Sequence, residues 1–146
     1  MKKLLAVLVV TIAASYVAAG FTRQTAAGQS NAAKATPAYE VLVLRKVAVA
    51  AELADLSSRF TGSSPAVEAK RFELNTIARE LQSMQRIESD EVSKLSRGYG
   101  NLILRKVALE VELDGLLRSY TPQHPDVEKK RVELDALQRE LREMLK

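Results

Sequence analysis

The sequence predicts an all-α protein that consists of two tandem antiparallel helical hairpins, coiled-coil-like, after an N-terminal signal or anchor segment. Three observations support this fold class: a duplicated block, a heptad spacing of apolar residues, and a proline-containing break inside each copy. Residues 39–84 and 99–144 align without a gap at an offset of 60 and agree at 22 of 46 positions. Because a duplication is an internal comparison, features kept in both copies are expected to be structural.

Apolar residues recur in each copy at spacings of three, four and seven, which is a heptad pattern, and the alternation typical of strands is absent. Lysines 46, 70, 106 and 130 occupy the skipped sites of the pattern. The positions of the predicted hairpin seams are Leu42, Val49, Leu53, Leu56, Phe60, Val67, Leu74, Ile77, Leu81, Met84, Leu102, Leu109, Leu113, Leu116, Tyr120, Val127, Leu134, Leu137, Leu141 and Met144.

A short proline-containing segment divides each copy, at residues 61–65 and 121–125. Proline cannot continue a helix, and the residue before it avoids helical angles. We therefore expect turns at Ser64, Pro65, His124 and Pro125, with antiparallel helices on either side because the connections are short.

The two hairpins are expected to span residues 38–96 and 97–146. The second helix of the first hairpin is predicted to continue to about Ser96, and a kink or turn is expected to follow because Gly98 and Gly100 should interrupt it. The first copy has an additional apolar flank, and the second copy keeps its first half but has Glu110 and Asp114 in place of the alanines. The flank consists of Val43, Val47, Ala50 and Ala54. We expect these flanks to contact each other or another chain, since a single helical hairpin buries little surface.

The first 19 residues are typical of a secretory signal, with two lysines before a short apolar run and small residues after it. Cleavage before Gly20 fits the spacing of Val17 and Ala19, and Thr25 with Ala27 offers a second site. An uncleaved membrane anchor is the alternative. Either way we expect export, with residues 20–37 as a flexible tether and Thr36 capping a helix that begins at Pro37.

Composition excludes several classes of function. The formal net charge is +4, but acids and bases interleave after residue 40, and the densest basic run, at residues 129–131, has glutamates on both sides. This pattern is typical of a solvated helix face, so no nucleic-acid partner is predicted. The chain has no cysteine, which removes disulfides, thiol catalysis and cysteine metal sites.

His124 is the only histidine and the first candidate for chemistry, as a general base or metal ligand. The first copy has Ser64 at the same place, before a proline, so a role at the helix start is favoured. No catalytic, metal or cofactor site is predicted. A recognition element for an anionic partner is considered at Arg45, Lys46, Arg105 and Lys106. The alternative is that the arginine of each pair is solvated while the stem of the lysine lies along the seam and its ammonium reaches water.

The segment from Leu117 to Val127 reads Leu-Arg-Ser-Tyr-Thr-Pro-Gln-His-Pro-Asp-Val and precedes the heptad of Leu134, Leu137 and Leu141. It resembles the periplasmic coiled-coil hairpin of polysaccharide chain-length determinant and exopolysaccharide export proteins. The resemblance implies the turn geometry and export. Those proteins have two membrane helices around a large α/β region, and this chain is expected to lack both the second helix and that region.

These observations predict a non-enzymatic exported protein, periplasmic or anchored to the inner membrane and facing the periplasm. It would act as an envelope scaffold, adaptor or oligomerisation module, through self-association or binding of another envelope protein. The alternative is an accessory of polysaccharide assembly or export that binds an anionic glycan or a membrane surface. A hydrolytic enzyme dependent on His124 is the third hypothesis and the least favoured.

Overall fold

The computed structural model describes residues 32–146, so the expected signal or anchor and most of the expected tether lie outside the described residues. The elements are α2 (Pro37–Arg59), α3 (Pro65–Met84), the short 3₁₀ helix η1 (Val92–Lys94), α4 (Arg97–Ser119) and α5 (Pro125–Leu145). Residues 32–146 contain no strand, which confirms the predicted all-α class.

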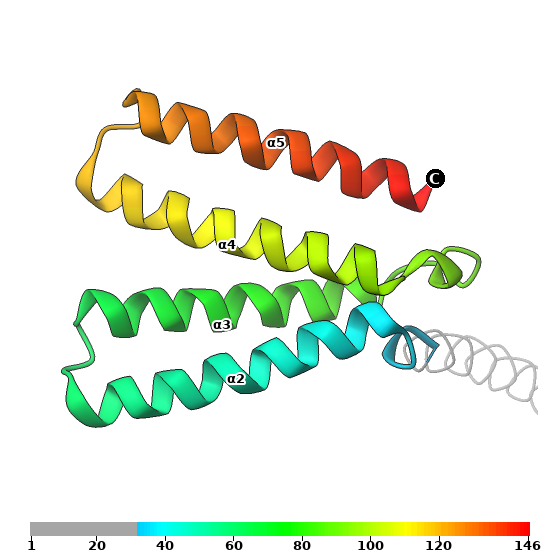
Figure 1. Ribbon diagram of the computed structural model, residues 1–146, viewed down its shortest axis with the longest axis horizontal. Helices are drawn as coiled ribbons and strands as arrows, with labels where there is room; N and C mark the ends of the chain where they lie inside the picture. The colour runs from blue at the N-terminus through cyan, green and yellow to red at the C-terminus, as the bar shows by residue number, and fades with distance from the viewer. Residues whose placement is uncertain (1–31) are drawn as a thin grey trace, which may run out of the picture.

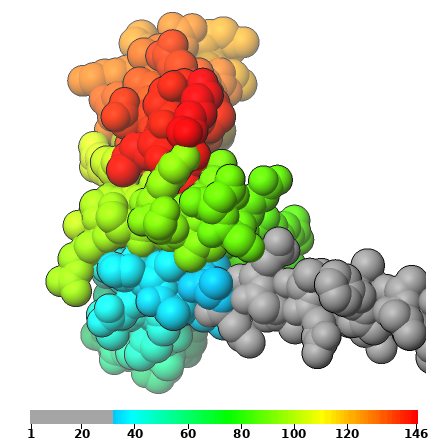
Figure 2. Space-filling view, turned by 90° about the vertical axis from the view of Figure 1, so that its right-hand side faces the viewer, coloured from blue at the N-terminus to red at the C-terminus, as the bar shows by residue number. Residues whose placement is uncertain are grey.

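The four long helices are arranged as two pairs, each with helices running in opposite directions (Figure 1). We call α2 with α3 the N-terminal pair and α4 with α5 the C-terminal pair. Helix α4 packs against α2, α3 and α5, whereas α5 packs chiefly against α4. The helices consequently form a stack in which α5 is the outermost layer (Figure 2).

Local sequence explains where the helices begin. The Thr36 hydroxyl accepts a hydrogen bond from the Tyr39 N–H at 3.3 Å, and the Ser96 hydroxyl accepts one from the Tyr99 N–H at 3.2 Å. Each bond satisfies a backbone donor that the first helical turn leaves unpaired. Prolines at the first positions of α2, α3 and α5 need no hydrogen-bond acceptor there. The predicted helix starts after both proline breaks are confirmed.

The main core runs along the interface of α2, α3 and α4 and continues to the end of α5. Its side chains are aliphatic, apart from one methionine and one tyrosine. All four long helices contribute residues to this core, which buries their apolar surface away from water. The buried members of this core are Ala33, Ala38, Leu42, Val49, Ile77, Leu81, Met84, Leu95, Tyr99, Ile103, Val107 and Leu141.

The connection between the pairs differs from the prediction. Helix α3 ends at Met84 rather than near Ser96, and turns and η1 follow before α4 begins. Leu95 explains the early end, because it is 1% exposed and its carbonyl accepts a hydrogen bond from the Ala38 N–H at 3.2 Å. Burying Leu95 against the start of α2 requires the chain to reverse, which a continued α3 could not do.

The expected kink at Gly98 and Gly100 is also wrong, since both glycines lie inside α4. A Cβ atom on Gly100 would lie 2.8 Å from the Ala38 Cα, so glycine at this position lets two helix backbones approach closely. The expected tether reaches residue 37, but Ala33 is fully buried and Thr36 is 8% exposed. The described end of that segment therefore belongs to the packed fold.

Candidate functional site

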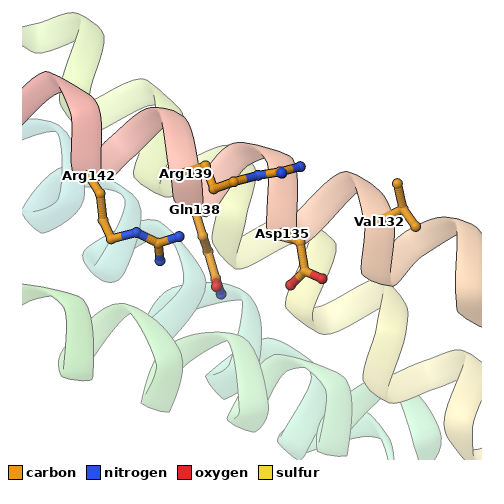
Figure 3. A pocket seen from close by; sticks show the side chains of 5 residues that line it. All are labelled: Val132, Asp135, Gln138, Arg139 and Arg142. Atoms are coloured by element: carbon orange, nitrogen blue, oxygen red, sulfur yellow. The ribbon is translucent and has the colours of Figure 1, made fainter.

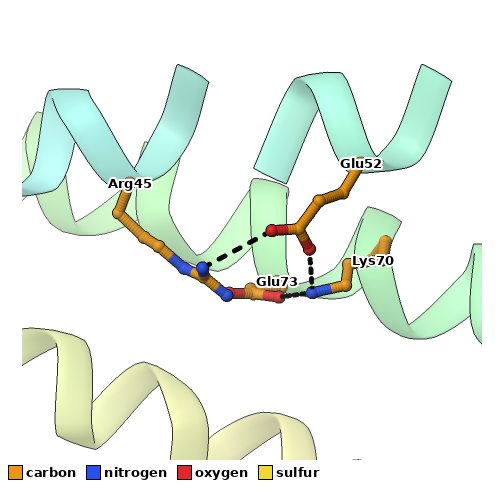
Figure 4. Close-up of polar contacts among 4 residues, drawn as sticks. All are labelled: Arg45, Glu52, Lys70 and Glu73. Atoms are coloured by element: carbon orange, nitrogen blue, oxygen red, sulfur yellow. Dashed lines mark hydrogen bonds and ion pairs between the residues drawn. The ribbon is translucent and has the colours of Figure 1, made fainter. Parts of the chain in front are cut away.

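Four charged side chains form a cluster between α2 and α3, which we call the N-terminal ionic cluster: Arg45, Glu52, Lys70 and Glu73 (Figure 4). Arg45 donates to Glu73 Oε1 from Nε at 2.9 Å and from Nη2 at 2.5 Å. Lys70 Nζ lies 2.9 Å from Glu73 Oε2 and 2.5 Å from Glu52 Oε2. Glu73 is only 9% exposed, so Arg45 and Lys70 replace much of the water that would otherwise stabilise its negative charge.

The duplication repeats this arrangement as the C-terminal ionic cluster, formed by Arg105, Glu112, Lys130 and Glu133. Lys130 Nζ lies 2.8 Å from Glu112 Oε2 and 3.0 Å from Glu133 Oε2, as in the first copy. Arg105 differs from Arg45, since it is exposed and has no carboxylate oxygen within 4 Å among the described residues. The Glu133 side chain is 35% exposed, so this copy is the more solvated one.

The ionic clusters perturb the pKa values of their members. Burial disfavours the charged form of Lys70, but hydrogen bonds to Glu52 and Glu73 outweigh it and raise the pKa of Lys70. The hydrogen bond from Lys70 lowers the pKa of Glu52, and the one from Lys130 lowers the pKa of Glu133. These three shifts favour the ionised forms of Lys70, Glu52 and Glu133.

Further ion pairs join the N-terminal pair to α4. Lys106 Nζ lies 2.5 Å from Glu80 Oε1 of α3 and, within α4, 3.5 Å from Glu110 Oε1. Arg79 Nη2 lies 3.6 Å from Glu110 Oε2. These contacts lie beside Ile103 and Val107, the buried α4 residues of the apolar core, and they fix α4 on α3.

The structure separates the four cations considered for an anionic partner. Arg45 and Lys106 are engaged by carboxylates, so a ligand would have to displace Glu73 or Glu80 to reach them. Lys46 and Arg105 are exposed and have no ion pair in the part of the chain that the structure describes. Lys46 was expected on the seam, but it projects from α2 into solvent while Arg45 turns toward α3.

His124 caps α5, where its Nδ1 accepts a hydrogen bond from the Asp126 N–H at 3.3 Å. Its ring stacks on Tyr120, with ring centroids 4.1 Å apart and an interplanar angle of 29°. Ser64 occupies the same position before α3, but its side chain makes no capping hydrogen bond. Tyr120 is 45% exposed rather than enclosed in the seam, because it follows the last residue of α4 with an extended backbone.

Phe60 repeats that difference in the first copy, with 51% of its surface exposed after the end of α2. The remaining predicted seam residues are buried or half-buried on facing sides of the helices. The seam residues therefore form the apolar interior of each pair except at its tip.

The exposed apolar surface is a feature that the seam pattern does not account for. Leu44 and Val47 on α2 are 63% and 64% exposed, and Val132 on α5 is 66% exposed. Val132 borders a shallow hollow of about 340 Å³, which Asp135, Gln138, Arg139 and Arg142 also line (Figure 3). All five residues belong to one helix, so the hollow has no opposing wall that could enclose a substrate. One signal in the sequence marks Val132: its counterpart in the first copy, Phe72, is also apolar and also lies off the seam.

Within residues 32–146, no three histidine, aspartate or glutamate side chains come together as metal ligands. None of the helices in this part of the chain is long and apolar enough to cross a membrane. Comparisons of the chain with protein-family models, with curated proteins and with solved structures find no match.

Proposed function

We propose that this protein is exported to the cell envelope and is not an enzyme. It binds other protein chains there as a scaffold, adaptor or oligomerisation unit. In this proposal each helix pair is one antiparallel, coiled-coil-like hairpin, and the two hairpins stack through α4. In this proposal the ionic clusters stabilise the packing of helices within each pair, and the exposed apolar surfaces bind the partner.

The observation that carries the proposal is the apolar surface of α2. Val47 and Leu44 are nearly two-thirds exposed in the middle of a helix whose opposite side is buried in the core. Contiguous exposed apolar surface on a soluble fold is typical of a protein-binding site, because its exposure to water is unfavourable until a partner covers it.

Site-specific photocrosslinking tests this function. A photoreactive amino acid is placed at Val47 of the full chain in living cells, and at Glu88, an exposed residue of the connection between α3 and α4, as the matched control. The proposal expects a discrete crosslinked protein product from position 47 and none from position 88. Equal labelling at both positions, or no product at position 47, would refute an interaction function of this surface.

A second candidate function is binding of an anionic glycan during polysaccharide assembly. Two observations favour it: Lys46 and Arg105 are exposed and have no carboxylate oxygen within 4 Å among residues 32–146, and the Tyr120–His124 stack lies at the tip of the turn that resembles export proteins. Binding to an acidic polysaccharide should then weaken as salt rises and should fall in Arg105→Gln. A matched Lys129→Gln variant should bind as the unchanged protein does. Equal binding by both variants would exclude this function for Arg105.

A further inference from the structure

The duplication provides two equivalent surfaces for stacking one helix pair on another, but only one of them is covered. In α4, Tyr99, Ile103 and Val107 are 6%, 2% and 2% exposed because they lie against the N-terminal pair. Their counterparts in α2 are less covered. Tyr39 and Val43 are partly buried against the core, and Val47 is 64% exposed.

The exposed counterpart on α2 is more apolar than the covered surface on α4. Where α4 has Glu110 and Asp114, α2 has Ala50 and Ala54, and both alanines are exposed. We define the docking face as Val43, Val47, Ala50 and Ala54. Its spacing of four, three and four places the four residues in one stripe along the helix.

The surface that receives α4 also has an uncovered counterpart. On α3, Thr76 is 1% exposed, and Phe72 lines an open hollow together with Leu113 and Leu117 of α4. The counterparts on α5 are Ala136 and Val132, both exposed. We define the receiving face as Val132, Ala136 and Glu140 of α5.

The charges on the two uncovered faces are complementary. Within the chain, Lys106 of α4 lies 2.5 Å from Glu80 of α3. The counterparts are Lys46, beside the docking face, and Glu140, on the receiving face. Both are exposed, and neither has an oppositely charged group within 4 Å in the described chain. One molecule therefore carries the two unpaired halves of an ion pair that it forms elsewhere within itself.

We propose that a second copy of this chain covers these surfaces, with the docking face of one molecule on the receiving face of the next and Lys46 paired with Glu140. This inference rests on the proposed interaction function and names its partner. The contact is heterologous, so an open assembly keeps one free docking face at one end and one free receiving face at the other. Addition continues along one axis, as repeats do in a solenoid, unless the assembly closes into a ring.

The contact between copies differs from the internal one at one end. Glu40 stands on α2 where α4 has Gly100, and Gly98 stands where the N-terminal pair has Ala38. The internal contact is close there because Gly100 has no Cβ. The Glu40 side chain is too large for that spacing, so the docked α2 diverges from the receiving helices at this end.

Two single variants test the proposal when they are studied apart and mixed. Val47→Asp blocks the docking face and Val132→Asp blocks the receiving face, and both positions are about two-thirds exposed, so the fold should survive. Light scattering after size-exclusion chromatography would give the mass of the full chain over a range of concentrations. The unchanged protein should form integer multiples of the monomer mass, and each variant alone should remain monomeric. An equimolar mixture should form a dimer and nothing larger. The intact docking face of Val132→Asp binds the intact receiving face of Val47→Asp, and the two faces left over are both blocked.

Each alternative outcome overturns the inference in a recognisable way. A monomeric unchanged protein at all concentrations excludes self-association, and a photocrosslink from Val47 to a different protein would then leave the proposed function intact. Self-association of Val132→Asp alone would show that two docking faces pair with each other. If circular dichroism shows that either variant has lost helicity, its mass no longer tests the proposal. A charge exchange at Lys46 and Glu140 then provides the test.

In that exchange, Lys46→Glu and Glu140→Lys should each weaken association about tenfold, and the double variant should recover most of the loss. Arg131→Glu is the control, because Arg131 is exposed on α5 outside the stripe of Val132, Ala136 and Glu140. Failure of the double variant to recover would refute the predicted pairing.

Discussion

Removing the Glu73 carboxylate should destabilise the fold far more than removing its duplicate, Glu133. Glu73→Ala leaves Arg45 without its carboxylate partner on α3 and takes one of two carboxylates from Lys70. Glu133→Ala removes a single contact, since Lys130 keeps Glu112 and Arg105 contacts neither. The same substitution at equivalent sites therefore separates the effect of burial from the effect of side-chain chemistry.

The expected magnitude follows from the contacts and their exposure. Glu73 accepts three hydrogen bonds from charged donors, and its side chain is 11% exposed. Breaking a fully buried pair costs about 3–5 kcal/mol. Arg45 and Lys70 keep 38% and 26% of their side-chain exposure and can recover water, so we expect a loss of about 2 kcal/mol in the free energy of unfolding. Glu133→Ala should cost much less, because exposed ion pairs contribute little to stability.

Urea unfolding followed by circular dichroism at 222 nm measures both losses. The two variants should have the same slope as the unchanged protein and different midpoints, because only stability changes. A third variant, Arg45→Met, tests the cause: combined with Glu73→Ala it should cost less than the sum of the two single changes. Equal losses in Glu73→Ala and Glu133→Ala would refute the argument that burial gives the N-terminal ionic cluster its stabilising role.

Two further predictions follow from single contacts. Gly100→Ala should lower the free energy of unfolding by about 1–2 kcal/mol, because its Cβ would lie 2.8 Å from the Ala38 Cα; Gly115→Ala, which meets nothing within 4 Å, should raise it by about 0.5–1 kcal/mol. A thermal melt of both variants decides this, and equal signs would contradict it. Folding lowers the pKa of Glu52 below 4.5, so the stability that Glu52 contributes is present above pH 4.5 and is lost as the pH falls through its folded-state pKa. Folding raises the pKa of Lys70 above 10.5, so the stability that Lys70 contributes is present below pH 10.5 and is lost as the pH rises through its folded-state pKa. Unfolding measured against pH should show both declines, and Glu52→Gln should make the acid decline shallower.

The all-α class and the positions of the helix starts could be predicted because local rules determine them. Pro65 and Pro125 each occupy the first turn of a helix in the structure, where proline is favoured. Thr36 caps α2 as its position before Pro37 indicates. These features depend on neighbours within four residues, and a single sequence contains that information.

The connection between the pairs could not be predicted in the same way. Ile87, Val92 and Leu95 fit a continued helix, but the burial of Leu95 beside Ala38 depends on two segments far apart in the chain. Gly100 gives a similar lesson. A glycine within a helical pattern suggests an interruption when read locally, and only the backbone of the opposing helix shows why it is needed.

The candidate surfaces were visible in the sequence only in part. The seam accounts for the apolar residues that the copies share, so the residues that differ between copies are informative about contacts between pairs. Glu110 of α4 contacts Lys106 and Arg79, and it stands where α2 has Ala50. At this position the helix that the N-terminal pair covers, α4, has glutamate, and the helix that is open to solvent, α2, has alanine.

This divergence bears on what the uncovered helix binds. If α2 were simply a solvent-facing helix, polar residues along its outer stripe would carry no penalty, and Glu110 and Asp114 show that the duplicate accommodates acids at these sites. Instead α2 has alanine at both positions next to an exposed valine, Val47. Exposed alanine and valine add apolar surface that favours burial, and they leave room for a second backbone to approach closely. An uncharged, small-residue stripe beside one unpaired lysine is the surface expected of a helix that packs against another helix bearing a carboxylate, and α5 of the same chain carries that carboxylate at Glu140.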